Sequence, residues 1–325
     1  MVVLLLRLTM YALSTGLCFG DIMFVTRMAP GIFISNISMS GDATLKLTKV
    51  IDSTTSTYAV GYDSKTLTIF WSDHDLNNIQ RYSFETEQHE PFQSTGDVFD
   101  LVVDEIGRKL YWVDTGVEVI NLDGTNRTVL LEANPLRLVS GIALDTTIGY
   151  LYWGIENEKI ERAQLNDTSN RETIVTGVQL PIGIALSPVD GKMYWCDPRA
   201  KIIEKANLDG TNRETVARIT PFMYDIEIYE NYLYVSTLDG MISIDIRNGQ
   251  VHNIVDDFPF ITGVYIGPDA CNPNPCQNSG NCSLTSTSSL FTCACTSGYT
   301  GRTCKTYRPT SGFNPIIITC PCNSP

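Results

Sequence analysis

The chain has 325 residues and a formal net charge of −13, long enough for one large core and a small appended module. All 36 acidic residues lie between Asp21 and Asp269; of the 23 basic residues, Arg7 and the three after Cys271 lie outside, so this stretch holds 19 bases and carries a net charge of −17. Such an acidic body excludes nucleic-acid binding, whose affinity comes from Lys and Arg. It favours basic protein partners, or serves solubility alone.

The first twenty residues resemble a secretory signal peptide. Val2 to Leu6 form an apolar run, Arg7 interrupts it, and small residues follow near Gly16 and Gly20. Elsewhere no stretch reaches the roughly 18 apolar residues that a membrane span needs. We therefore expect a signal peptide at 1–20 and a protein that is secreted or lies on the outer face of the plasma membrane.

A repeated aromatic block organises residues 21–267. It appears as Phe70-Trp71-Ser72-Asp73, Tyr111-Trp112-Val113-Asp114, Tyr152-Trp153-Gly154-Ile155, Tyr194-Trp195-Cys196-Asp197 and Tyr234-Val235-Ser236-Thr237. The starts of successive blocks differ by 40 to 42 residues, an interval typical of four-stranded propeller blades. The last four blocks follow a short apolar run and a turn, and Leu-Asp-Gly turns at 122–124 and 208–210 predict a second hairpin. Each repeat is therefore expected to contain four strands.

Closure of the ring requires a sixth repeat, which the two ends of this region supply. Residues 23–26 resemble a block and are followed by strand-like stretches at 32–37 and 44–50, whereas 260–266 resemble a first strand without a block. We expect the C-terminal strand to complete the blade begun at the N-terminus, because closure removes the exposed sheet edges.

The repeated residues predict a structural role. Aspartates inside apolar strands are costly unless they are hydrogen-bonded, and these recur once per repeat like packing residues. We interpret this set as structural: Asp73, Tyr111, Trp112, Asp114, Tyr152, Trp153, Tyr194, Trp195 and Asp197. Cys196 replaces the third residue of its block and is expected to be a buried, inert thiol.

Six cysteines between Cys271 and Cys304 indicate an oxidising compartment and a small disulfide-stapled module at 271–304. Asn-x-Ser/Thr triplets at Asn36, Asn126 and Asn166 predict glycosylation. Residues 305–325 form a tail with Cys320 and Cys322, which could begin another module or pair between chains.

The blocks, their spacing and the Leu-Asp-Gly turns resemble the low-density lipoprotein receptor class B family, whose signature is Tyr-Trp-Thr-Asp (YWTD). The resemblance implies an all-β fold, a six-bladed β-propeller, as in lipoprotein receptor-related proteins and nidogens. The cysteine pattern with Gly298-Tyr299-Thr300-Gly301 resembles an EGF-like domain. That family's pairing implies the disulfides Cys271–Cys282, Cys276–Cys293 and Cys295–Cys304. Leu284 stands where calcium-binding EGF domains have Asp or Asn, so no metal is expected.

Family resemblance implies a non-enzymatic protein that presents one face to extracellular protein ligands, without a cofactor. Receptor-like ligand capture or a Wnt-type co-receptor role is the first hypothesis, and a matrix linker like nidogen is the alternative. Segments entering the innermost strands form the candidate ligand face, namely Phe99, Asp100, Ser140, Ile182, Phe222 and Tyr224. Ile182 stands where the receptor family has a ligand-binding Asn. A calcium-dependent lactonase is a remote alternative, since the three histidines lie in dissimilar contexts.

Overall fold

The computed structural model describes residues 21–28, 31–37, 41, 43–52, 56–132, 138–268, 270–272, 274–285 and 290–308. The expected signal peptide, Cys320 and Cys322 lie outside these ranges. Within them the chain forms strands and turns, and none of these residues forms a helix able to cross a bilayer.

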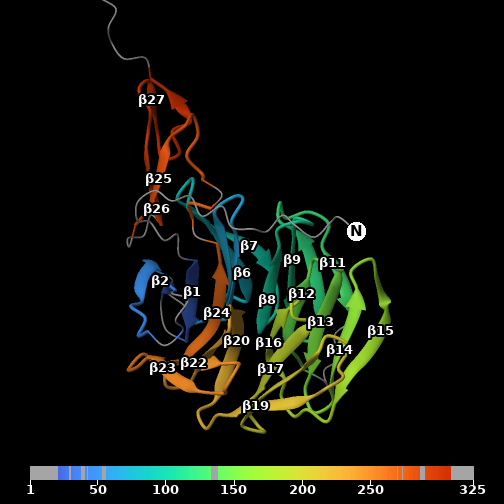
Figure 1. The fold of residues 1–325 in the computed structure, drawn as a ribbon. Helices are drawn as coiled ribbons and strands as arrows, with labels where there is room; N and C mark the ends of the chain where they lie inside the picture. The colour runs from blue at the N-terminus through green and yellow to red at the C-terminus, as the bar shows by residue number, and fades with distance from the viewer. Residues whose placement is uncertain are drawn as a thin grey trace, which may run out of the picture.

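Six four-stranded antiparallel sheets surround a central axis, with the strands of each sheet following one another from the centre outward (Figure 1). Blade 1 consists of β24 (Ile261–Gly267), β1 (Ile22–Arg27), β2 (Ile32–Asn36) and β3 (Thr48–Ile51); blade 2 of β4 (Thr57–Asp63), β5 (Thr68–Asp73), β6 (Asn78–Ser83) and β7 (Gln88–Ser94); blade 3 of β8 (Asp100–Asp104), β9 (Lys109–Val113), β10 (Val117–Asn121) and β11 (Thr128–Leu131). Blade 4 consists of β12 (Val139–Asp145), β13 (Tyr150–Ile155), β14 (Lys159–Gln164) and β15 (Asp167–Thr176); blade 5 of β16 (Ile182–Ser187), β17 (Lys192–Asp197), β18 (Ile202–Asn207) and β19 (Glu214–Arg218); blade 6 of β20 (Met223–Tyr229), β21 (Tyr232–Thr237), β22 (Met241–Asp245) and β23 (Val251–Val255).

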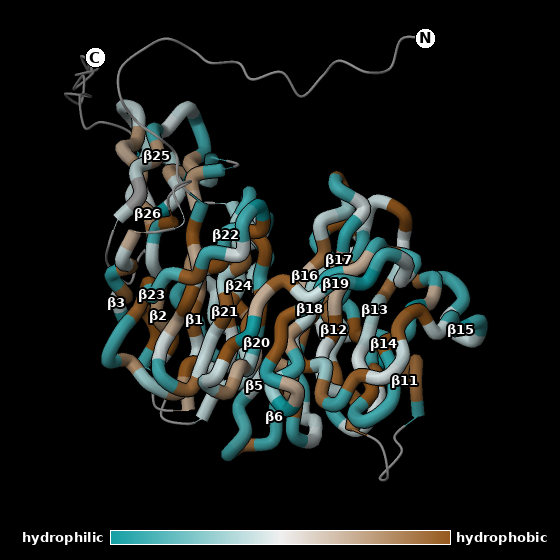
Figure 2. Tube along the Cα trace, turned by 60° about the horizontal axis from the view of Figure 1, so that its bottom comes forward, coloured by the Kyte–Doolittle hydropathy of each residue, from teal (hydrophilic) through white to brown (hydrophobic). Residues whose placement is uncertain are grey.

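The second strand of each blade is buried on both sides, because neighbouring blades cover its two faces. The aromatic blocks lie in these strands, and Trp71, Trp112, Trp153 and Trp195 are all at most 2% exposed. Hydrophobic segments run along the strands, and hydrophilic ones gather in the connecting turns (Figure 2). The repeat therefore encodes the packing between blades.

Pairing of the two chain ends closes the ring. β24 pairs with β1 from Gly267 opposite Ile22 to Ile261 opposite Arg27. The inner strands contact one another in the order β4, β8, β12, β16, β20, β24 and back to β4. The predicted six-bladed propeller is confirmed, as is the prediction that one blade, here blade 1, is built from both ends of this region.

The strand predicted at 44–50 differs from the structure. β3 begins at Thr48, and the backbone N–H of Leu45 instead donates to the carbonyl of Ile254 in blade 6. Leu45 and Leu47 pack against the apolar cluster between blades 6 and 1. Burial against the neighbouring blade therefore replaces continuation of the outer strand.

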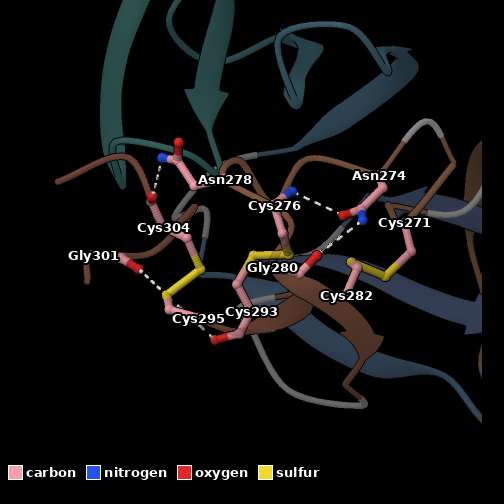
Figure 3. The surroundings of a disulfide bond; sticks show 10 residues. All are labelled: Cys271, Asn274, Cys276, Asn278, Gly280, Cys282, Cys293, Cys295, Gly301 and Cys304. Atoms are coloured by element: carbon pink, nitrogen blue, oxygen red, sulfur yellow. Dashed lines mark hydrogen bonds between the residues drawn. A yellow bond between two sulfur atoms is a disulfide. The ribbon is translucent and has the colours of Figure 1, made fainter. Parts of the chain in front are cut away.

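The EGF-like domain follows β24 and lies against one side of the ring (Figure 1). Its hairpin consists of β25 (Asn281–Leu284) and β26 (Phe291–Ala294), followed by β27 (Tyr299–Thr300) and β28 (Thr306–Tyr307). Three disulfides join Cys271 to Cys282, Cys276 to Cys293 and Cys295 to Cys304, the pairing implied by the family resemblance (Figure 3).

The two faces of the propeller are named here by their position relative to the EGF-like domain. We call the face that it touches the module face; it carries the turns between first and second strands and between third and fourth strands. Leu67 and Phe84 of blade 2 are buried there with Leu290 and Phe291 of the EGF-like domain. The opposite face, here the far face, carries the turns between second and third strands and the entries into the inner strands.

Candidate ligand-binding face and central channel

Backbone pairing shows which residues are equivalent at the far-face end of the inner strands. In each blade one apolar inner-strand residue pairs with the second residue of the block: Val60, Leu101, Ile142, Ile184, Ile226 and Val264. In blade 1 this block residue is Val25, so the block there spans 24–27 and the prediction of 23–26 is wrong by one residue. Two residues earlier, at the mouth of the central channel, stand Tyr58, Phe99, Ser140, Ile182, Tyr224 and Thr262. Four of the six predicted face residues thus occupy one equivalent position.

Exposure separates these candidates. Phe222 is 38% exposed, and Phe99, Ile182 and Tyr224 are half-buried. Ser140 is 3% exposed, and its hydroxyl donates to the carbonyl of Pro181 in the next blade at 2.9 Å. The prediction for Ser140 is therefore wrong, because this hydroxyl joins two blades and is not presented to a ligand.

Aromatic side chains gather around the channel mouth. The rings of Phe222 and Tyr224 lie 5.0 Å apart, and those of Tyr58 and His74 lie 4.9 Å apart. Burial, followed by the neighbouring Tyr58, raises the pKa of Tyr224, which places the two pairs in one neighbourhood. We name Tyr58, Phe222 and Tyr224 the mouth cluster; Phe99 instead packs against the apolar cluster between blades 3 and 4.

Acidic side chains border this cluster. His74 Nε2 lies 3.2 Å from Asp97 Oδ1. Burial raises the pKa of Tyr58, and the carboxylates of Asp97 and Asp75 raise it further. The nearby Leu76, in the turn after β5, is 57% exposed. The far face therefore combines aromatic, aliphatic and anionic groups, the chemistry expected of a surface for a partly basic protein partner.

Sequence reasoning missed Tyr58. Blade 2 lacks a continuous apolar run before its block, because Gly61 interrupts it. The signal that could have found Tyr58 is spacing, since it lies 41 residues before Phe99.

Asp100 does not lie on the far face but points into the channel. Its carboxylate accepts the N–H groups of Leu101 at 2.8 Å and of Ile142, in the next blade, at 2.9 Å. Asp225 does the same with Ile226 at 2.8 Å and Val264 at 2.9 Å. The interpretation of Asp100 as a ligand-contacting residue is corrected: it joins two inner strands.

The channel between the inner strands is narrow, with a cavity of about 140 Å³. Glycines occupy the position of Asp100 in three other blades, because a side chain would strike the neighbouring strand. A Cβ at Gly141 would lie 2.8 Å from the nitrogen of Gly183, and one at Gly183 would lie 2.9 Å from the nitrogen of Ile226. At the same position, Asp100 and Asp225 place their carboxylates in the narrow lumen that the closely packed inner strands leave.

The repeated aspartates organise far-face turns. Asp73 accepts the N–H of Leu76 at 3.0 Å, and Asp114 that of Gly116 at 2.8 Å. Asp197 accepts the N–H groups of Gln179 at 2.7 Å, Leu180 at 3.1 Å and Ala200 at 3.1 Å. These contacts fix the block's end to the turn that follows and, in blade 5, to the segment entering the inner strand.

Cys196 is fully buried, and its thiol donates to the carbonyl of Ile182 at 2.9 Å. Burial, followed by the charge of Asp225, raises the pKa of this thiol well above its ordinary value. Ser72 and Ser236 contact their inner strands from the same block position. Cys196 therefore stands in for a structural hydroxyl.

Comparison with known proteins agrees with this architecture. The EGF-like domain family matches residues 271–303. Low-density lipoprotein receptor-related protein 5 of Mus musculus is 32% identical over 121 residues, 35% of this chain and 7% of that protein. A chain from the crystal structure of a nidogen–laminin complex superposes with a TM-score of 0.69 at 20% identity, over 76% of this chain and 98% of that one.

This chain is a YWTD-type six-bladed propeller with an EGF-like domain. It spans a small fraction of the curated relative that it matches, so that relative's whole activity does not transfer. A gluconolactonase from Xanthomonas campestris also superposes, with a TM-score of 0.57 at 13% identity over 77% of this chain and 92% of that one. At that identity the likeness concerns the fold alone. Extracellular relatives and three disulfides indicate an extracellular protein.

The channel of this YWTD propeller holds three carboxylates, those of Asp100, Asp225 and Glu227. Burial raises the pKa of Asp225 to about 7; burial and the charge of Asp225 raise that of Asp100 well above its ordinary range. Burial, followed by the charges of Asp225 and Asp100, likewise raises the pKa of Glu227 well above its ordinary value. The walls of the channel surround these three side chains, which line its narrow lumen. Among the described residues, no group of three His, Cys, Asp or Glu side chains could hold a metal ion.

The Asp225→Asn variant tests this channel. Because the folded pKa of Asp225 exceeds its unfolded value near 3.8, the folded protein binds the extra proton between about pH 4 and pH 7. The stability that Asp225 contributes is therefore present below pH 4 and is lost as pH rises through 7. Urea unfolding should show the variant gaining stability relative to the wild type between pH 4 and pH 8. An equal difference at both pH values, or the same gain in the exposed-site control Asp256→Asn, would contradict this assignment.

Proposed function

We propose that the far face binds extracellular protein ligands, with the mouth cluster at the centre of the contact. The observation that carries this proposal is the concentration of three aromatic side chains, Tyr58, Phe222 and Tyr224, at one channel mouth, beside Leu76 and acidic Asp75 and Asp97. Aromatic residues at the centre of an interface, bordered by charged groups, are the usual composition of binding hot spots.

Catalysis has less support. The channel carboxylates Asp100 and Asp225 already accept two backbone N–H groups each, and the raised pKa values favour their neutral forms. A carboxylate used in this way joins strands and has little remaining capacity to activate a substrate. We infer a protein that binds and does not catalyse.

Two finer functions are proposed. Likeness to low-density lipoprotein receptor-related protein 5 supports receptor-like ligand capture, including a Wnt-type co-receptor role. Likeness to a chain of a nidogen–laminin complex supports a secreted matrix linker. Localisation separates them: the full-length protein should be retained at the cell surface in the first case and in the matrix in the second.

The binding face is tested by the double variant Phe222→Ser/Tyr224→Ser. The propeller with its EGF-like domain is immobilised, and proteins retained from extracellular fluid are quantified. We expect proteins held by the wild type to be reduced at least about tenfold by the variant, since hot-spot aromatics contribute this much or more. Val129→Ser, which removes an exposed apolar group from outer strand β11, is the control and should retain them. Equal retention by all three forms would refute the assignment of this face.

A further inference from the structure

The module face carries exposed apolar residues in three consecutive blades. Ile106 in blade 3 is 79% exposed, Ile148 in blade 4 is 55% exposed and Val189 in blade 5 is 93% exposed. All three lie in the turn between the first and second strands of their blades. Single exposed apolar residues are common, but recurrence in the same turn of neighbouring blades is a pattern that needs an explanation.

Blade 2 shows what such a turn can bind. Its apolar turn residue, Leu67, is 5% exposed because it packs with Leu290 and Phe291 of the EGF-like domain. Leu67 has a φ of 51°, in the left-handed region, where blades 4 and 5 have Gly149 and Gly191. Arg108 of blade 3 has the same conformation at the same place, with a φ of 56°, so the backbone geometry belongs to the turn and the EGF-like domain accounts only for the burial of Leu67.

A charge pair accompanies this apolar contact. Arg302 of the EGF-like domain lies 2.7 Å from Glu87, in the turn between the third and fourth strands of blade 2. The guanidinium also stacks 5.0 Å from the centroid of Phe291. Blade 2 is thus bound through an apolar residue in one turn and a carboxylate in the adjacent one, by a partner surface where arginine stands beside an aromatic ring.

Blades 3 to 5 carry the same two kinds of group in the corresponding turns, with the apolar residue one or two positions before the place that Leu67 occupies in blade 2. Alongside Ile106, Ile148 and Val189, exposed carboxylates stand in or next to the turns between the third and fourth strands, at Asp123, Asp167 and Asp209. Hydroxyls of Thr125, Ser169 and Thr211 donate to them. The arginines in the turns of these blades are already ion-paired: Arg108 with Asp63, Arg127 with Glu118 and Arg213 with Glu204. The surface therefore offers apolar groups and negative charge together.

We infer that the module face of blades 3 to 5 is a second docking surface, occupied by a protein segment in which Arg or Lys stands beside aromatic or aliphatic side chains. The glycosylation predicted at Asn126 and Asn166 falls in the same turns as Asp123 and Asp167, so the inference applies to the protein without glycans at these two sites. Two observations favour a partner of this chemistry. The surface continues the interface that the EGF-like domain makes on blade 2, and its carboxylates complement a cationic partner. This surface is distinct from the far face and does not depend on the function proposed for it.

Methyl NMR of the whole chain tests the inference, with labels on isoleucine and valine methyl groups. The probe is the peptide acetyl-Arg-Phe-Arg-Phe-amide; acetyl-Glu-Phe-Glu-Phe-amide and acetyl-Arg-Ser-Arg-Ser-amide are the matched controls. We expect the probe to shift the signals of Ile106, Ile148 and Val189, and both controls to bind about tenfold more weakly, because apolar contact and charge act together. Asp123→Asn/Asp167→Asn/Asp209→Asn should weaken the probe similarly, whereas Phe222→Ser/Tyr224→Ser should not.

Several outcomes of the wild-type titration would overturn the inference, even if a variant failed to fold. These are unshifted signals at the three residues, equal shifts with all three peptides, or shifts confined to methyl groups of the far face. Shifts of the same signals with protein concentration alone would show that a second copy is the occupant, which contradicts the partner proposed here.

Discussion

Replacement of Arg108 by alanine should lower the free energy of unfolding by about 2–4 kcal/mol, below the upper end of the range for a fully buried ion pair because the Arg108 side chain is 33% exposed. Arg108 Nη1 and Nη2 bind both oxygens of Asp63, at 2.6 and 2.5 Å. The Asp63 side chain is 1% exposed. Loss of the guanidinium would leave a buried carboxylate without its cation at the junction of blades 2 and 3. Urea unfolding measures the change.

The double variant Arg108→Ala/Asp63→Ala should recover part of this loss, because no buried charge remains. Lys49→Ala is the matched control, since Lys49 pairs with an Asp52 side chain that is 83% exposed. Exposed pairs contribute at most about 1 kcal/mol. If the Arg108 and Lys49 variants lost equal stability, the pair would have no special role between the blades.

Gly263→Val should destabilise the propeller by more than about 3 kcal/mol, because overpacking against a backbone that cannot yield is costly. Gly263 lies in β24, the strand that closes the ring. A Cβ there would lie 2.6 Å from Thr26 Oγ1 and closer still to the carbonyl oxygen of Tyr58 in blade 2. The variant should melt at a markedly lower temperature or show no cooperative transition.

Gly96→Val provides the comparison, because the nearest heavy atom to a Cβ at Gly96 is Asp114 Oδ2 at 3.8 Å. Its melting temperature should stay within a few degrees of the wild type. A Gly263→Val protein that melted like the Gly96→Val protein would show that the closing blade does not limit stability.

The fold was predictable because the packing residues recur. Trp71, Trp112, Trp153 and Trp195 are buried at equivalent places, so their spacing encodes the blades directly. The two-piece blade was predictable from closure, since an open sheet edge is unfavourable. The cysteine spacing likewise identified the EGF-like domain, whose disulfides hold a small hydrophobic core.

The candidate site was less predictable, since position along an inner strand does not determine where a side chain points. Ser140 and Tyr58 occupy equivalent positions, yet one is buried by Pro181 of the next blade and the other stacks near His74. Asp100 turns into the channel because backbone N–H groups of two blades meet its carboxylate. Such outcomes depend on contacts between blades, which a single repeat does not contain.

The most direct test of the far face as a binding surface uses one purified partner retained by the immobilised chain. Its affinity is measured by surface plasmon resonance for the wild type, Phe222→Ser/Tyr224→Ser and Val129→Ser, each at low and high salt. If the far face is the binding surface, we expect at least about tenfold weaker binding for the far-face variant alone, and weaker binding by the wild type at high salt, because Asp75 and Asp97 border the cluster. Equal affinity of the wild type and the far-face variant would contradict this assignment.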